Sequence, residues 1–244
     1  PFFYHQDPAN PEAQESRGLG DVYKRQGQET MHWNAYSFKV DGANEEAVVN
    51  LLDKQFNNNL AEGVTAYLYS VMFSDSDFQA THQVIFTGTA KAFNNMMSSQ
   101  NLETQLFFSK LNNFIEDGVS SGNGTTVLNF NNETVFPFQI VTIMNIDGWD
   151  ELDILRNTLT TLNNKYPRSD RGLIHGNIRS GVHSRGTHYF VSGYNSYGDL
   201  LELDMNHRDQ NPNYYKERST LNKKIDWDNF TRVRRFSRVL VKKW

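Results

Sequence analysis

Several residue classes that commonly mark function are absent from this 244-residue sequence. It contains no cysteine, which excludes disulfides, thiolate nucleophiles and cysteine-based zinc or iron–sulfur sites. No apolar run reaches the roughly 18 residues that a membrane-spanning helix needs. Glycine-rich nucleotide loops and the Gly-x-Ser-x-Gly turn of many hydrolases are also missing. The sequence therefore lacks the common signatures of membrane, nucleotide and hydrolase function.

Charge is nearly balanced, with 24 Lys and Arg against 28 Asp and Glu, a net charge of −4 and a pI near 6.0. A general nucleic-acid binder would show a basic excess, so we expect no nucleic-acid partner. Basic residues gather only near the C-terminus, at Arg232, Arg234, Arg235, Arg238, Lys242 and Lys243. This pattern predicts an edge strand that uses charge to block pairing, with an anion-binding or partner-binding strip as the alternative. Because cysteine and a visible signal peptide are missing, we expect a cytoplasmic protein, although periplasmic proteins can lack cysteine too.

The first 30 residues are expected to stand outside the fold. Residues 16–26 (S-R-G-L-G-D-V-Y-K-R-Q) back-translate, codon for codon, into a transposase sequencing adapter. Residues 1–15 are rich in Pro, Gln, Asn and Glu and show no periodic apolar pattern. We interpret this segment as artefactual, with a natural disordered tail as the alternative, and predict no packed structure in it. The native start is then Met31 or lies upstream.

The rest of the chain repeats itself at a constant spacing of 106 residues. The matches include Asp41-Gly42 with Asp147-Gly148, Val48-Val49 with Ile154-Leu155, Ser74 with Ser180, and Thr81-His82 with Thr187-His188. A gapless match of this kind indicates two copies of one structural unit. We expect the first copy at residues 31–130, a linker at 131–137 and the second copy at 138–244.

Apolar periodicity predicts the same elements in each copy. In the first copy we expect strands at residues 33–40, 64–73, 82–87 and 125–130, and helices at 48–60 and 90–115, the latter broken near Ser98-Ser99. In the second copy we expect strands at 138–146, 172–179, 187–194 and 230–241, helices at 149–166 and 197–205, and mixed structure at 212–224. The Gly- and Ser-rich residues 120–124 are expected to form a loop.

This β-α-β-β-α-β order is that of the α+β, ferredoxin-like unit, whose antiparallel sheet carries both helices on one face. The other face must be buried, and the two antiparallel sheets of a tandem repeat can pack face to face. Over residues 32–241, element order, copy length and the repeated Thr-His strand start make the chain resemble the dimeric α/β-barrel superfamily in fused, tandem form. The resemblance implies monooxygenase- or isomerase-like chemistry. Some members of the superfamily handle haem, for which a His could be an axial ligand, but no His stands out in this sequence, and no cofactor is required by it.

One strand face of the second copy is polar, and it carries the predicted catalytic residues His175, Asn177 and Arg179. Leu173 lies on the same face. At a spacing of 106 residues, the first copy has Tyr67, Tyr69, Val71 and Phe73, which are aromatic or apolar, in these four positions. If this face lines the space between the sheets, it forms an apolar pocket with a few placed polar groups, in which both tyrosines bind the ligand. The alternative is an exposed sheet face.

The repeated His82 and His188 are added to the predicted ligand-binding residues. The alternative is a structural role, with a ring nitrogen bonded to loop backbone where the hairpin begins. His183 and Arg185 in the hairpin loop are candidates to gate a site, with a flexible, solvated turn as the alternative. His207 and Arg208, where the second copy departs from the repeat, are second-line candidates. His175, His183 and His188 lack a recognised ligand spacing, so we predict no metal site.

Two functions are compatible with these observations. The first is binding or conversion of a small apolar organic molecule, with His as acid or base because its pKa lies near neutrality. The alternative is a non-catalytic sensing or assembly module that uses sheet edges and the basic C-terminal strand. In either case we expect a monomeric pseudo-dimer or a homodimer.

Overall fold

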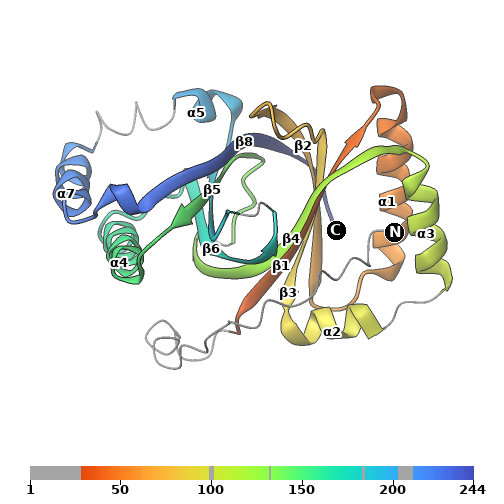
Figure 1. Ribbon diagram of the computed structural model, residues 1–244, viewed down its shortest axis with the longest axis horizontal. Helices are drawn as coiled ribbons and strands as arrows, with labels where there is room; N and C mark the ends of the chain where they lie inside the picture. The colour runs from red at the N-terminus through yellow and green to blue at the C-terminus, as the bar shows by residue number, and fades with distance from the viewer. Residues whose placement is uncertain (1–28, 99–101, 132, 183–184, 203–210) are drawn as a thin grey trace.

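The computed structural model describes residues 29–98, 102–131, 133–182, 185–202 and 211–244 (Figure 1). The sequence predictions for residues 1–28, His183, His207 and Arg208 therefore lie outside the described residues. The first half of the chain contains β1 (Met31–Val40), η1 (Gly42–Asn44), α1 (Glu45–Asn59), β2 (Val64–Ser74), β3 (His82–Thr89), α2 (Ala90–Ser98), α3 (Leu102–Asn112) and β4 (Ile115–Phe130). The second half contains β5 (Phe138–Ile146), α4 (Trp149–Lys165), β6 (Arg171–Gly181), β7 (His188–Tyr194), α5 (Tyr197–Glu202), α7 (Pro212–Asn222), η2 (Trp227–Asn229) and β8 (Phe230–Lys243).

All eight strands form one closed antiparallel barrel in the order β1-β3-β2-β8-β5-β7-β6-β4. Each half supplies four neighbouring strands in the ferredoxin-like order, β4-β1-β3-β2 and β8-β5-β7-β6. The strand pairing also repeats in the same register, because His82 lies opposite Phe38 and His188 lies opposite Met144. The α+β architecture predicted from the repeat is therefore present.

Two separate sheets packed face to face, as the sequence led us to expect, are not shown. The edge strands of the two halves instead pair with each other, β2 with β8 and β4 with β6, and close the barrel. Closure removes the unpaired backbone groups that an edge strand exposes. The prediction that the basic C-terminal strand is an edge strand is wrong, because β8 is paired on one side with β2 and on the other with β5.

The fourth strand is much longer than predicted, because the expected loop at residues 120–124 is part of β4. Glycine makes this pairing possible. A Cβ atom at Gly124 would lie 2.0 Å from the carbonyl oxygen of Asn177 and 2.6 Å from the Trp33 ring. The Gly- and Ser-rich composition therefore reflects close approach of neighbouring strands and side chains rather than a turn.

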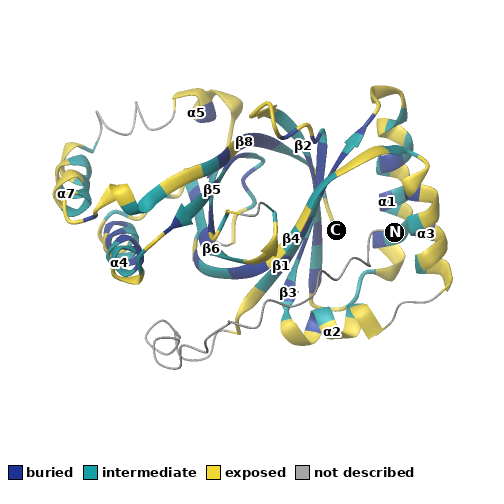
Figure 2. Ribbon diagram, in the orientation of Figure 1, coloured by how far each residue is buried: buried dark blue, intermediate teal, exposed yellow. Residues whose placement is uncertain are grey.

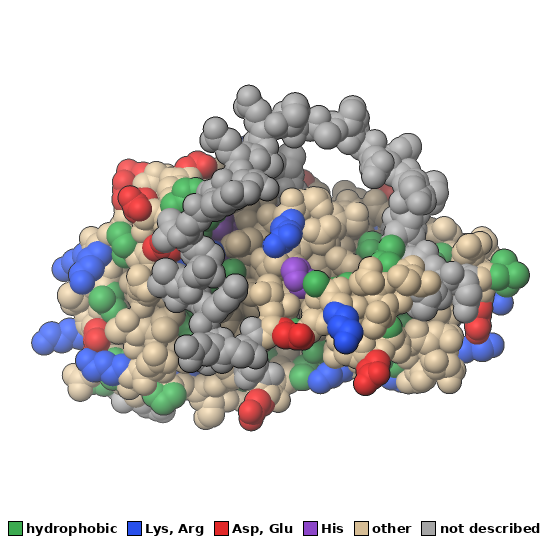
Figure 3. Space-filling view, turned by 90° about the horizontal axis from the view of Figure 1, so that it is seen from below, with side chains coloured by type: hydrophobic (Ala, Val, Ile, Leu, Met, Phe, Trp, Pro, Cys, Tyr) green, Lys and Arg blue, Asp and Glu red, His purple; other side chains and the backbone are tan. Residues whose placement is uncertain are grey.

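The helices cover the barrel on two opposite sides (Figure 1). Helices α1 and α3 lie on the side of the first half, and α4 and α7 on the side of the second. Figure 2 shows that the buried residues follow the barrel strands and the helix faces turned towards them. No helix of the described residues is both long and apolar enough to cross a membrane. On the described part of the face seen in Figure 3, acidic and basic side chains are interspersed.

The barrel interior is apolar at its centre, where Val141, Ile143, Val191 and Phe236 pack with Phe78 from the β2–β3 connection. Its polar side chains gather around the buried guanidinium of Arg238. Its Nε and Nη2 atoms donate to Oε1 of Gln139 over 2.9 and 2.6 Å, and Nη1 donates to Gln83. The guanidinium also lies 4.0 Å above the Tyr69 ring. Amide oxygens and an aromatic face thus stabilise this charge inside the barrel.

Candidate functional site in the first half

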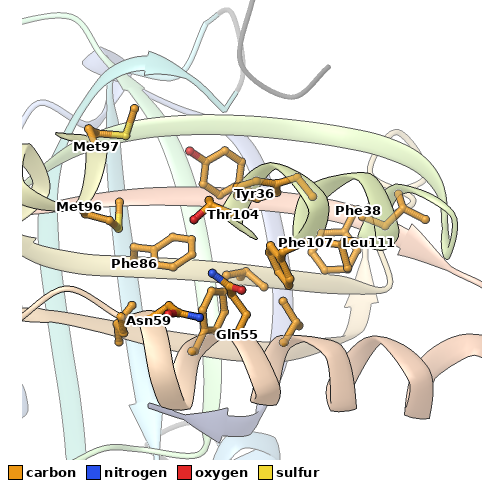
Figure 4. Close-up of a pocket in the computed structure, with 16 residues that line it drawn as sticks. Tyr36, Phe38, Gln55, Asn59, Phe86, Met96, Met97, Thr104, Phe107 and Leu111 are labelled. Carbon is orange, nitrogen blue, oxygen red and sulfur yellow. The ribbon is translucent and has the colours of Figure 1, made fainter. Parts of the chain in front are cut away.

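A cavity of about 220 Å³ lies between the barrel and the helices of the first half. Its floor is formed by side chains of β1 and β3, and its walls by side chains of α1, α2 and α3 (Figure 4). The lining residues are mostly aromatic or aliphatic, and they are Tyr36, Phe38, Leu52, Gln55, Phe56, Asn59, Leu60, Val84, Phe86, Met96, Met97, Thr104, Phe107, Phe108, Leu111 and Ile115. An apolar cavity with a few polar groups is typical of a small-molecule site.

Helical and strand periodicity place these residues together. Val48, Leu52 and Phe56 recur every fourth residue of α1 and are buried against the sheet. On β3, Val84 and Phe86 alternate with residues that face the barrel interior, so both project towards the helices. The Phe56 ring stands edge-on to Phe86 with 5.3 Å between centroids. Rigid aromatic contacts of this kind hold one wall of the cavity in place.

Among its described lining residues, the cavity carries hydrogen-bonding groups but no ionised side chain. Gln55 and Asn59 come from successive turns of α1, and Thr104 and Tyr36 lie on the other side of the cavity in the view of Figure 4. Burial raises the pKa of Tyr36, so its phenol stays neutral at physiological pH. His82 lies just behind the lining, stacked on Phe38, and burial lowers the pKa of this imidazole. The electrostatic environment is therefore that of a neutral pocket.

The corresponding layer of the second half, between β6, β7 and α4, is polar. His175 is fully buried and stacks on Phe190 with 4.5 Å between ring centroids. Neither ring nitrogen of His175 has a hydrogen-bond partner among the described residues. Arg156 of α4 donates from Nη2 to Oδ1 of Asn177 over 2.9 Å. Nδ1 of His188 lies 2.8 Å from Oγ1 of Thr187.

Burial and positive charge keep both histidines of this layer neutral. Burial lowers the pKa of His188 to about 4, and the nearby Arg156 guanidinium contributes in the same direction. The pKa of His175 is lowered well below its usual value by burial, with smaller contributions from Arg156 and His188. Both imidazoles are therefore neutral near pH 7, the form in which a histidine can accept a proton.

The seven residues predicted to form the site are not brought together. His175, Asn177 and His188 share the outer face of the barrel under α4, but Arg179 is exposed near the end of β6. Tyr69 contacts Arg238 in the barrel interior, and Tyr67 lies on the same face of β2 as Tyr69. His82 lies on the outer face of the first half, with Nδ1 2.9 Å from Thr81 Oγ1.

A shift of one residue between the repeats of the two halves explains why the predicted residues lie apart. His82 pairs with Ser70, whereas His188 pairs with Asn177, so the spacing between the halves is 107 residues on this strand. His175 therefore corresponds to the buried Leu68 of β2 and not to Tyr69. Because neighbouring strand residues point to opposite faces, an alignment shifted by one residue exchanges the two faces.

The polar residues of the cavity were missed by the sequence analysis. Gln55 and Asn59 lie on a helix that was predicted from its apolar positions alone. Their spacing of four residues places them on one face of α1, next to the buried Phe56. That spacing was a usable signal. Thr104 of α3 carried no such signal, because its partners in the lining come from other elements.

No protein-family model and no curated protein matches this chain. Solved structures do match. A protein of Fusobacterium nucleatum, provisionally named a monooxygenase, has 16% identity and a TM-score of 0.59 over 88% of this chain and 94% of its own. A second, from Lactobacillus acidophilus and given the same provisional name, has 12% identity and a TM-score of 0.54 over 87% and 94%. An anthrone oxidase-like protein has 8% identity and a TM-score of 0.54 over 89% and 94%.

These matches show that the chain has the dimeric α/β-barrel fold. The matches cover nearly the whole barrel with its helices, which confirms the resemblance that the element order and repeat predicted. Identities this low show the fold alone, and activity has to be argued from the site.

Haem does not fit the cavity of the first half. An engineered cavity of about 150 Å³ takes benzene, and a tetrapyrrole is several times larger than that ligand, whereas this cavity measures about 220 Å³. No His and no cation is present among the lining residues to ligate iron or pair with the propionates. In the second half, His175 is fully buried against Phe190 and α4. We therefore derive no chemistry from haem.

Proposed function

We propose that this protein binds a small, largely apolar organic molecule in the cavity of the first half. The cavity itself carries the proposal, because its lining is mostly apolar and includes several aromatic rings, with amide and hydroxyl groups at its sides. Burying the apolar surface of a ligand there contributes about 25 cal/mol per Å². The amide and hydroxyl groups would orient the bound molecule.

Conversion of the bound molecule, in a monooxygenase-like or isomerase-like step, is the second part of the proposal. The likeness to two proteins provisionally named monooxygenases and to an anthrone oxidase-like protein supports the oxygenation reading. An isomerase-like proton transfer needs an acid or base, and the lining contains only the neutral Tyr36. Sensing without conversion is the alternative that this lack of acid–base groups favours.

Binding is tested by filling the cavity. In Thr104→Trp a large ring would occupy the cavity, whereas Leu106→Trp places the same ring on the exposed side of α3. An environment-sensitive apolar fluorophore should bind the wild type and Leu106→Trp and should lose most of its binding to Thr104→Trp. Equal binding to all three proteins would place the ligand elsewhere. Mass spectrometry of a bound ligand after incubation with oxygen then separates oxygenation from binding alone.

The polar layer under α4 offers a secondary site for the predicted catalytic residues His175 and Asn177. A substrate there would have to separate α4 from the sheet, because His175 is fully buried. His175→Leu should leave fluorophore binding unchanged if the cavity of the first half is the site. A loss of binding in His175→Leu with normal folding would move the proposal to the second half.

A further inference from the structure

We propose that the cavity selects uncharged ligands of one or two rings, and that Gln55 recognises a polar substituent on them. This inference rests on the proposed function, since it specifies the ligand of the same cavity. It depends on three observations, namely the volume of the cavity, the lack of charge in its lining, and the position of one half-buried amide.

Volume limits the size of the ligand. A cavity of about 150 Å³ lined by Leu, Ile and Phe takes one benzene ring. The cavity of the first half, at about 220 Å³, exceeds that volume by about half. One ring with substituents or two fused rings fit this space, and a larger ring system would need the helices to move.

Charge limits the chemical class of the ligand. None of the sixteen lining residues is Lys, Arg, His, Asp or Glu. Asp53, on the neighbouring turn of α1, is already engaged, because it accepts from Nε1 of Trp244 over 2.7 Å and pairs with Lys242. A carboxylate entering the cavity would lose its hydration without meeting a cation, which disfavours it strongly. An isosteric amide or alcohol avoids most of that loss.

Gln55 is the side chain positioned to form a hydrogen bond with a polar substituent of the ligand. It is half-buried on α1, lines the cavity, and its amide has no hydrogen-bond partner among the described residues. An amide can both donate and accept, so it can bind either a carbonyl or a hydroxyl group. Tyr36 and Thr104 already take part in other interactions, and Asn59 is exposed. Gln55 is therefore the specificity-determining residue of this proposal.

Three ligands with the same two fused rings test the inference on the full chain, namely naphthalene and the nearly isosteric pair 2-naphthamide and 2-naphthoate. Affinities are measured by displacement of the apolar fluorophore at pH 7.5. We expect naphthalene and 2-naphthamide to bind, and 2-naphthoate to bind at least about 100-fold more weakly than the amide. Gln55→Leu should weaken 2-naphthamide about 10-fold and leave naphthalene within about 2-fold, since it removes one hydrogen bond but keeps the apolar wall.

Gln105→Leu is the matched control, because Gln105 is exposed on α3 and is not part of the lining. It should change neither affinity, and thermal unfolding of each variant shows that it is folded. Equal affinity for 2-naphthoate and 2-naphthamide would overturn the inference while leaving the proposed function standing. An equal loss of naphthalene and 2-naphthamide in Gln55→Leu would overturn the role of Gln55. If none of the three ligands displaces the fluorophore from wild type, the inference is overturned, whereas the proposed function fails only if Thr104→Trp binds the fluorophore as wild type does.

Discussion

Between the barrel and α1 and α3 of the first half, Leu68, Val84 and Phe86 of the outer sheet face meet apolar helix residues around a cavity. Between the barrel and α4 of the second half, the same strand order carries His175 and Asn177 beneath the guanidinium of Arg156. One layer is apolar with space for a ligand, and the other is polar with a fully buried histidine.

This difference shows that the strand order constrains the side chains of the helix–sheet layer only weakly. Closure of the barrel and packing of its interior hold the backbone in place, so each outer layer can change its chemistry separately. The barrel interior shows the same freedom. Arg238 of β8 lies opposite Gln139, and at the equivalent place in the first half Gly124 of β4 lies opposite Trp33. The facing pair Arg238 and Gln139 of the second half thus corresponds to the facing pair Gly124 and Trp33 of the first half.

The largest effect should follow from removing the ring that connects the cavity wall to the rest of the apolar layer. Phe56 contacts Phe86, Phe107 and Trp244, with centroids 5.3, 6.0 and 5.1 Å away. Phe56→Ala should destabilise the fold by about 3–5 kcal/mol in urea unfolding. A loss below about 1 kcal/mol would mean that the apolar layer is loosely packed, and would remove the contrast between the layers.

Acid should destabilise the second half more than the first. The pKa of His188 is about 4 in the folded state, against about 6.5 for a solvent-exposed histidine. A histidine with a lowered folded-state pKa contributes stability that is fully present above the unfolded pKa and is lost as pH falls from there towards the folded pKa. Between pH 7 and pH 5, His188 alone should cost roughly 2 kcal/mol.

Urea unfolding at pH 7, 6 and 5 measures this loss. His188→Gln should flatten the dependence by about the same amount, because glutamine does not titrate. His82→Gln is the matched variant of the first half, and burial lowers the pKa of His82 as well, without a contribution from a neighbouring arginine. If both variants flatten the dependence equally, the electrostatic difference between the layers is wrong.

The sequence predicted the architecture well because the relevant signals are local or repeated. Apolar periodicity located α1, α2, α3 and α4, with α2 ending at Ser98 and α3 beginning at Leu102, but it left the residues of α7 as mixed structure. The repeated Thr-His pair located the start of β3 and β7. Barrel closure could not be predicted in this way, because an edge strand and a strand paired on both sides can have the same charged, alternating pattern. β8 is the example.

The candidate site was less predictable, and the reason is also physical. Polarity marked His175 correctly as unusual, but the inner and outer faces of β6 could be told apart only from the strand register. The connection from α1 to β2 is one residue shorter than the connection from α4 to β6. Residues 106 positions apart on β2 and β6 therefore point to opposite faces of the sheet. The cavity depends on how three helices pack on the sheet, and no spacing within a single element encodes such packing.

Removal of one threonine hydroxyl should have a smaller effect on stability, and the effect should be the same in both halves. Thr81 Oγ1 accepts from the backbone N–H of Val40 over 2.9 Å, and Thr187 Oγ1 accepts from that of Ile146 over 3.0 Å. Each hydroxyl also contacts Nδ1 of the following histidine. Thr81→Val and Thr187→Val should each cost about 1–2 kcal/mol, because valine keeps the shape and leaves a buried donor unpaired. A large difference between the two variants would show that only one of these two threonine hydrogen bonds stabilises the fold.

The smallest effect tests the layer difference most directly. His175 corresponds to Leu68, so His175→Leu gives the second half the residue of the first. Both ring nitrogens of His175 lack a partner among the described residues, and leaving buried polar groups unpaired is unfavourable. Leucine has nearly the volume of histidine and packs well against Phe190. We therefore expect His175→Leu to stabilise the protein by about 1 kcal/mol at pH 7, measured by urea unfolding, and by more at pH 5, where the unfolded histidine gains a proton. The reciprocal change, Leu68→His, should destabilise the first half, since it buries an imidazole in an apolar cluster. Destabilisation by His175→Leu would show instead that the imidazole has a partner in solution, and would favour a polar site under α4.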